Sequence, residues 1–167
     1  MSLRQVRRRC EQLARSIDVP DPFDIEGLLG DLGMRRGRPI VLLPFALPAG
    51  APSGLCVAAG SADYLVVTAS ATGPQRDHIV LHELAHLLLG HRLQALDPDA
   101  DVQLFRHLDP AVIRTMLGRT TYSTIEEQEA EILASLLGQR AHPWAAPAPD
   151  RTSDPVVEQL GRSLEHG

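Results

Sequence analysis

An H-E-x-x-H pattern at residues 82–86 lies inside a segment, residues 78–91, that is apolar both before and after it. We expect this segment to form a largely buried helix. On a helix, His82 and His86 lie on one face, about 40° apart around the axis and about 6 Å apart along it. This spacing allows two imidazoles to bind one Zn²⁺. Glu83 would then lie near the open position of the metal, where a carboxylate can take a proton from a bound water.

Burial makes a metal ion the expected partner of these three side chains. Two imidazoles and a carboxylate that are buried without partners would cost several kcal/mol of folding free energy. The alternative is a partly exposed helix whose histidines are solvated.

The composition is that of an ordinary globular protein. The chain has 167 residues, with 44% apolar and 22% charged residues, which suits one domain with its own core. The net charge of −5 gives no case for direct nucleic-acid binding, and no apolar run reaches the length of a membrane span. No apolar signal segment follows the basic start. Because Cys10 and Cys56 form no paired motif, we expect a cytoplasmic protein with reduced thiols.

The apolar periodicity predicts an α+β fold, with helices packed on a small antiparallel sheet of about three strands. Pro44 cannot donate a hydrogen bond to a neighbouring strand, so the first strand is expected at an edge. The turn residues 60–63 predict a hairpin between the next two strands, and Gly33 is expected to end the second helix. The predicted helices are residues 2–17, 23–32, 74–89, 110–117 and 124–139, and the predicted strands are residues 39–47, 54–59 and 64–69.

The composition changes near residue 140. Residues 1–140 are expected to form a single domain. Residues 141–167 begin with a stretch rich in Pro and Ala and are expected to form a C-terminal tail, with a candidate short helix at residues 156–164.

A catalytic zinc site needs a third protein ligand besides the two histidines. His91 comes one position too early for the spacing of the metzincins, so we expect it to contact a ligand rather than the metal. His78 lies one turn before His82 on the same face. Because three consecutive helical turns converge poorly on one ion, His78 is also expected beside the ligands.

The remaining candidates are four acidic residues of the helix at residues 124–139. Glu126 is explained by a capping box with Ser123. Glu129 precedes Leu133 by one helical turn and therefore lies on the apolar side, where a carboxylate needs a charged partner. We therefore choose Glu129, which would give a His₂Glu site. The alternative, an acidic first turn favoured by the helix dipole, explains Glu129 poorly. The four candidates are Glu126, Glu127, Glu129 and Glu131.

Two segments of the chain together resemble the ImmA/IrrE-type metallopeptidase-like proteins. The first is residues 78–91. The second, residues 127–137, is similar to the family's E-x-E-A-x-x-F-A-x-x-L-L helix, with Leu133 where phenylalanine is common. The order of N-terminal helices, small sheet, metal helix and glutamate helix is also similar, and the resemblance covers roughly residues 20–140.

The resemblance implies a zincin-like domain that binds Zn²⁺ through His82, His86 and Glu129. It implies that Glu83 is the catalytic acid/base of a zinc-dependent metalloendopeptidase. Known members act with helix-turn-helix repressors, which they cleave or inactivate. We therefore expect a protein substrate, such as a neighbouring helix-turn-helix regulator.

The sequence does not determine two other features of such a site, the oxyanion donor and the place where the substrate binds. An oxyanion donor is needed, and Tyr122 and His107 are candidates. An extended substrate would pair with the edge of the small sheet. The alternatives to a peptidase are a binding module that sequesters a regulator without cutting it, and the toxin component of a toxin–antitoxin-like module.

Overall fold

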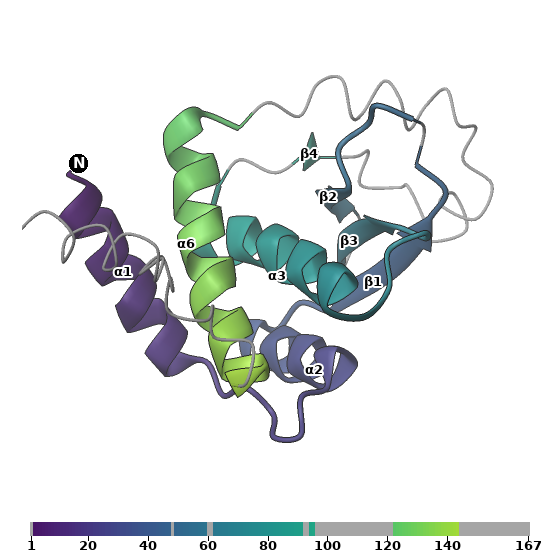
Figure 1. The fold of residues 1–167 in the computed structure, drawn as a ribbon. Helices are drawn as coiled ribbons and strands as arrows, with labels where there is room; N and C mark the ends of the chain where they lie inside the picture. Colours follow the sequence, from purple (N-terminus) through teal and green to yellow (C-terminus); the bar gives the residue numbers. More distant parts are fainter. Residues whose placement is uncertain (1, 48, 60–61, 92–93, 96–121, 144–167) are drawn as a thin grey trace, which may run out of the picture.

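The structure is a computed structural model, and it describes residues 2–47, 49–59, 62–91, 94–95 and 122–143 (Figure 1). These residues form four helices and a small mixed sheet, an α+β fold as predicted. The predicted helix at residues 110–117, His107 and the tail after residue 143 lie outside the described residues. The elements are α1 (Leu3–Ser16), α2 (Ile25–Arg36), β1 (Ile40–Phe45), β2 (Gly54–Ala59), β3 (Ala62–Thr68), α3 (Gly73–Leu89), the two-residue β4 (Gln94–Ala95) and α6 (Thr124–Ala141).

The strands lie in the order β1-β3-β2-β4. β2 and β3 pair antiparallel, which confirms the predicted hairpin, and β1 lies at an edge, where the missing N–H of Pro44 is tolerated. The prediction of an antiparallel sheet was wrong, because β1 pairs with β3, and β4 with β2, in parallel. In this order β3 lies between β1 and β2, so that β1 is the neighbour of a strand that runs in the same direction.

Helix α2 is longer than the sequence predicted. It ends at Gly37, which has a left-handed φ of 67°, rather than at Gly33. Gly33 lies inside the helix and is buried, and a Cβ there would lie 3.1 Å from the backbone nitrogen of Ile40. Its small size therefore lets the start of β1 approach the helix, and it does not end α2.

The two helices that carry the motif residues begin and end at the predicted signals. Pro74 lies in the first turn of α3, and Gly90 ends that helix with a φ of 73°. In α6, the side chain of Ser123 accepts a hydrogen bond from the Glu126 backbone, and the Glu126 side chain accepts one from Ser123. This confirms the predicted capping box.

The main core lies between these helices and one face of the sheet. Helix α3 contacts α6, β2 and β3, while α1 packs on α6 (Figure 1). Fully buried leucines of α3 and α6 fill the contact between them, among them Leu81, Leu84, Leu133 and Leu137. Among the described helices, none has both the length and the apolar character that crossing a bilayer would require.

Candidate metal centre

Helix α3 presents two imidazoles to the same point. The Nε2 atoms of His82 and His86 lie 3.2 Å apart, as expected for residues one turn apart on one helix face. The side chain of His86 is 1% exposed and that of His82 is 23% exposed. Burial lowers the pKa of His86 to about 3, and His82 and His91 act in the same direction. His86 is therefore neutral, which is the form of imidazole that binds metals.

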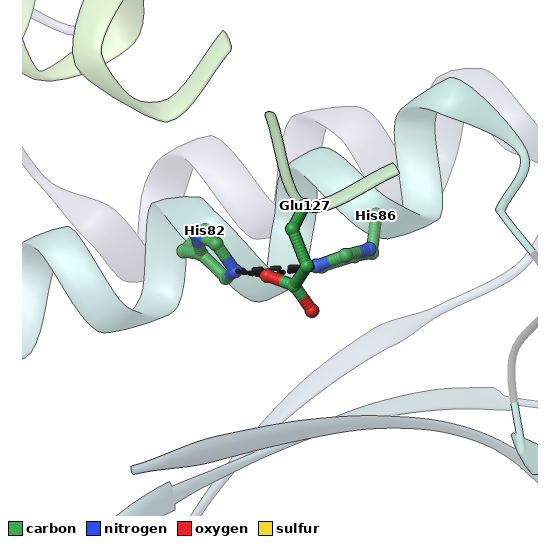
Figure 2. A group of neighbouring side chains, drawn as sticks. All are labelled: His82, His86 and Glu127. Carbon is green, nitrogen blue, oxygen red and sulfur yellow. Dashed lines mark hydrogen bonds and ion pairs between the residues drawn. The ribbon is translucent and has the colours of Figure 1, made fainter. Parts of the chain in front are cut away.

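The first turn of α6 brings a carboxylate to this pair. The Oε2 atom of Glu127 lies 3.3 Å from Nε2 of His82 and 3.9 Å from Nε2 of His86 (Figure 2). The three candidate ligand atoms lie within 4.8 Å of one another. Two imidazole nitrogens and one carboxylate oxygen around a single point could hold a metal ion, and they match a common donor set of hydrolytic zinc sites.

The carboxylate in this group is Glu127, whereas the sequence analysis chose Glu129. Glu129 is buried on the other side of α6, where its Oε2 atom lies 3.0 Å from His91 Nε2 and its Oε1 atom 3.5 Å from Arg9 of α1. The expectation assumed that the apolar side of α6 faces the metal. That side also packs against α1, whereas the side chain of Glu127, which reaches the histidines, is 48% exposed.

Glu83 lies beside this group and is almost completely buried. The backbone N–H of Cys56 donates a hydrogen bond to its carboxylate, and its Oε2 atom has no hydrogen-bond partner among the described residues. Burial raises the pKa of Glu83 to about 8, and the charge of Glu127 acts in the same direction. A cation nearby would favour the ionised form.

Strand β2 passes close over Glu83. A Cβ built on Gly54 would lie 2.6 Å from Oε1 of Glu83, so only glycine fits there without a shift. The start of β2 and helix α3 enclose a cavity of about 280 Å³ that all these groups share. Its lining comprises Pro52, Ser53, Gly54, Leu55, His78, Ile79, His82, Glu83, His86, Tyr122 and Glu127.

Tyr122 covers one face of a candidate ligand. Its ring stacks on His86, with centroids 3.6 Å apart and planes 17° apart. Its hydroxyl is buried and has no partner in the described part of the chain. Burial raises the pKa of Tyr122. The hydroxyl therefore stays protonated and can donate a hydrogen bond. The other candidate oxyanion donor, His107, lies outside the described residues.

The far nitrogens of both imidazoles have partners of their own. His86 Nδ1 lies 2.9 Å from His91 Nδ1. His82 Nδ1 lies 3.4 Å from Glu131 Oε2, which is also 3.4 Å from His78 Nε2. The structure thus places His78 and His91 beside the group rather than in it.

The places of Glu127, Glu131 and Gly54 beside the two histidines and Glu83 were not predicted from the sequence. The two glutamates are four residues apart, the same spacing as the two histidines, so that each helix presents one face to the other. This matched spacing is a signal in the sequence that could have identified the face. No local signal identifies Gly54, because its closeness to Glu83 depends on the packing of β2 against α3.

Comparisons of the chain with protein-family models, with curated proteins and with solved structures give no match. The resemblance to the ImmA/IrrE-type proteins therefore stays a prediction from the motif residues.

Proposed function

We propose that this protein is a zinc-dependent metalloendopeptidase of the ImmA/IrrE type with a zincin-like fold. His82, His86 and Glu127 would hold the ion. The observation that carries the proposal is the convergence of these three side chains in the cavity that Glu83 also lines. A solvated histidine pair would need neither a carboxylate from a second helix nor a buried glutamate with a free oxygen.

A zinc ion in this place would supply a Lewis acid and lower the pKa of a bound water. Glu83 takes the proton of the attacking water and returns it to the leaving amine nitrogen of the scissile peptide bond. The backbone N–H of Cys56 favours the ionised form of this carboxylate and so lowers its pKa, against the effect of burial. The Tyr122 hydroxyl lines the cavity without a hydrogen-bond partner among the described residues, and it stabilises the negative charge that develops on the carbonyl oxygen.

The substrate is proposed to be an extended segment of a protein. β4 pairs only with Val57 and Ala58 of β2. Among the described strands, none therefore covers that side of the first β2 residues, Gly54 and Leu55, which line the cavity. An extended segment that adds to this edge would bring a peptide bond next to Glu83. By resemblance to the family, the partner is a helix-turn-helix regulator.

The test is incubation of the zinc-loaded protein with the regulator encoded beside it, followed by mass spectrometry of the products. We expect defined fragments from the wild type, and no fragments from a Glu83→Gln variant that still binds zinc. Glu26→Gln, at a side chain of α2 that is 65% exposed, is the matched control and keeps full activity. Full cleavage by Glu83→Gln would refute the role of Glu83. Binding without cleavage by the loaded wild type would refute the peptidase and favour a module that sequesters the regulator.

A further inference from the structure

We propose that His91 and Glu129 set the position of the proton on His86, and so leave its Nε2 atom free to bind the metal ion. His91 is then a positioning residue, which acts on the metal through His86. The inference rests on the proposed function, because it concerns the same metal centre. The inference gives a role to Glu129, which is buried and does not belong to the group of candidate ligands.

The four side chains form a continuous row from α1 to α3. Arg9 lies 3.5 Å from Glu129 Oε1. Glu129 Oε2 lies 3.0 Å from His91 Nε2, and His91 Nδ1 lies 2.9 Å from His86 Nδ1. His86 Nε2 is the atom that faces His82 and Glu127. Contacts at hydrogen-bond or ion-pair distance therefore connect Arg9 to His86 Nδ1, while His86 Nε2 has two neighbours on the opposite side, His82 and Glu127.

The direction of the hydrogen bonds follows from the carboxylate. An ionised carboxylate only accepts hydrogen bonds, so His91 must carry a proton on Nε2 to bond with Glu129. The Nδ1 atom of a neutral His91 is then an acceptor, and His86 must donate to it from Nδ1. A neutral imidazole with its proton on Nδ1 has its lone pair on Nε2. The row thus selects the tautomer of His86 whose free nitrogen points at the candidate metal position.

Arg9 of α1 contacts Glu129, the carboxylate that determines the direction of the hydrogen bonds. The side chains of Glu129 and His91 are each 5% exposed, and a buried carboxylate without a positive or donating partner would be costly. Arg9 supplies the positive partner, and it also donates a hydrogen bond to the backbone oxygen of Leu89 at the end of α3. Glu129 thus has a positive partner on α1, a helix that contributes no candidate ligand.

His82 has a looser partner at its far nitrogen. Glu131 lies 3.4 Å from His82 Nδ1, and its side chain is 52% exposed. Water can replace such a contact, whereas it does not reach the buried contact between His86 and His91. The effect on metal binding should therefore be larger at His91 than at Glu131.

The first readout is the tautomer of His86 in the metal-free protein, measured by long-range ¹H–¹⁵N NMR of the imidazole rings. In the wild type we expect the proton on Nδ1. The variant His91→Leu removes the acceptor of the His86 Nδ1 proton and leaves a side chain of similar size. In this variant we expect the Nε2–H tautomer of His86 to appear. A wild-type His86 that carries its proton on Nε2 would overturn the inference.

The second readout is zinc affinity, measured by competition with a chromogenic chelator. Loss of an outer hydrogen-bond partner weakens metal binding by about 10–100-fold, and we expect a loss in this range for His91→Leu. His91→Asn should restore most of the affinity, because its amide oxygen can accept the proton of His86 Nδ1. His142→Leu is the control, because His142 pairs with Asp77 away from the metal group; it should leave the affinity unchanged.

These outcomes separate the inference from the proposed function. Unchanged affinity and an unchanged tautomer in His91→Leu would overturn the inference and leave the peptidase standing. Thermal unfolding of the metal-free variants excludes a general loss of folding, because His91→Leu and His91→Asn should differ far more in zinc affinity than in melting temperature. A wild type that binds no zinc would refute the proposed function, while the tautomer measurement would still give its own answer.

Discussion

Gly54 lies so close to the Glu83 side chain that there is no room for a Cβ atom between them. The Cβ of any other residue at this position would meet three atoms of the Glu83 side chain within 3.0 Å. The glycine lies in a regular strand, so no unusual backbone angle explains it. The absence of a side chain at Gly54 lets the start of β2 lie close to Glu83 of α3.

The substitution Gly54→Ala should therefore damage activity more than metal binding. We expect the added methyl group to displace Glu83 or the start of β2, and to lower the cleavage rate by at least about tenfold, since small displacements of a reacting group cost up to about 100-fold. Zinc content should stay close to that of the wild type, because no ligand is touched. Gly30→Ala is the control: a Cβ there meets no atom within 4 Å, and activity should be unchanged. Full activity of Gly54→Ala would contradict the assigned place of Glu83.

The burial of Glu83 also predicts how the metal-free protein responds to pH. Its pKa rises from 4.5 to about 8 on folding, mainly because of burial. Between these values the folded state holds a proton that the unfolded state has released, so the stability falls as pH increases. Glu83→Gln removes this dependence. Relative to the wild type, the variant should gain up to about 1.4 kcal/mol of unfolding free energy per pH unit over this range.

Urea denaturation with a chelator present, at about pH 5 and about pH 8, measures this difference. The low pKa of His86 contributes equally to both proteins and cancels in the comparison. A constant difference between variant and wild type across the range would show that Glu83 is not buried as described.

Among the secondary-structure elements, helices α3 and α6 could be predicted from the sequence, while the face of α6 that contacts His82 and His86 could not. Pro74, Gly90 and the capping box at Ser123 are local signals, and local signals place the ends of helices. The apolar side of α6 did not indicate which glutamate contacts the two histidines, because α6 packs against both α1 and α3. Glu129 faces α1 and Glu127 faces α3, and hydrophobicity does not tell the two partners apart.

The cap of α6 should matter for metal binding because Glu127 lies in the first helical turn. Ser123→Ala removes the capping box, and we expect a loss of about 1 kcal/mol of stability together with weaker zinc binding. Ser2→Ala removes the equivalent box of α1, which holds no candidate ligand. It should cost similar stability and leave zinc affinity unchanged. Chemical denaturation and chelator competition on both variants provide the comparison, and equal zinc affinities would contradict a first turn that holds the metal.

At the scale of the whole molecule, the site exists because three elements that are distant in sequence meet. α3 supplies the histidines and Glu83, α6 supplies Glu127, and β2 closes the cavity. The fold class followed from the sequence, since hydrophobic periodicity distinguishes helices from strands. The parallel pairing of β1 with β3 did not, because the order of the strands in the sheet depends on tertiary packing, which hydrophobic periodicity does not encode.

We propose that His82, His86 and Glu127 together bind one metal ion. The most direct test of this proposal is the zinc content, by mass spectrometry, of the wild type and of the variants Glu127→Ala and Glu129→Ala after loading with excess zinc. We predict an equimolar amount of zinc in the wild type, loss of zinc in Glu127→Ala, and retention of most of it in Glu129→Ala. Full zinc in Glu127→Ala, with loss in Glu129→Ala, would contradict the account.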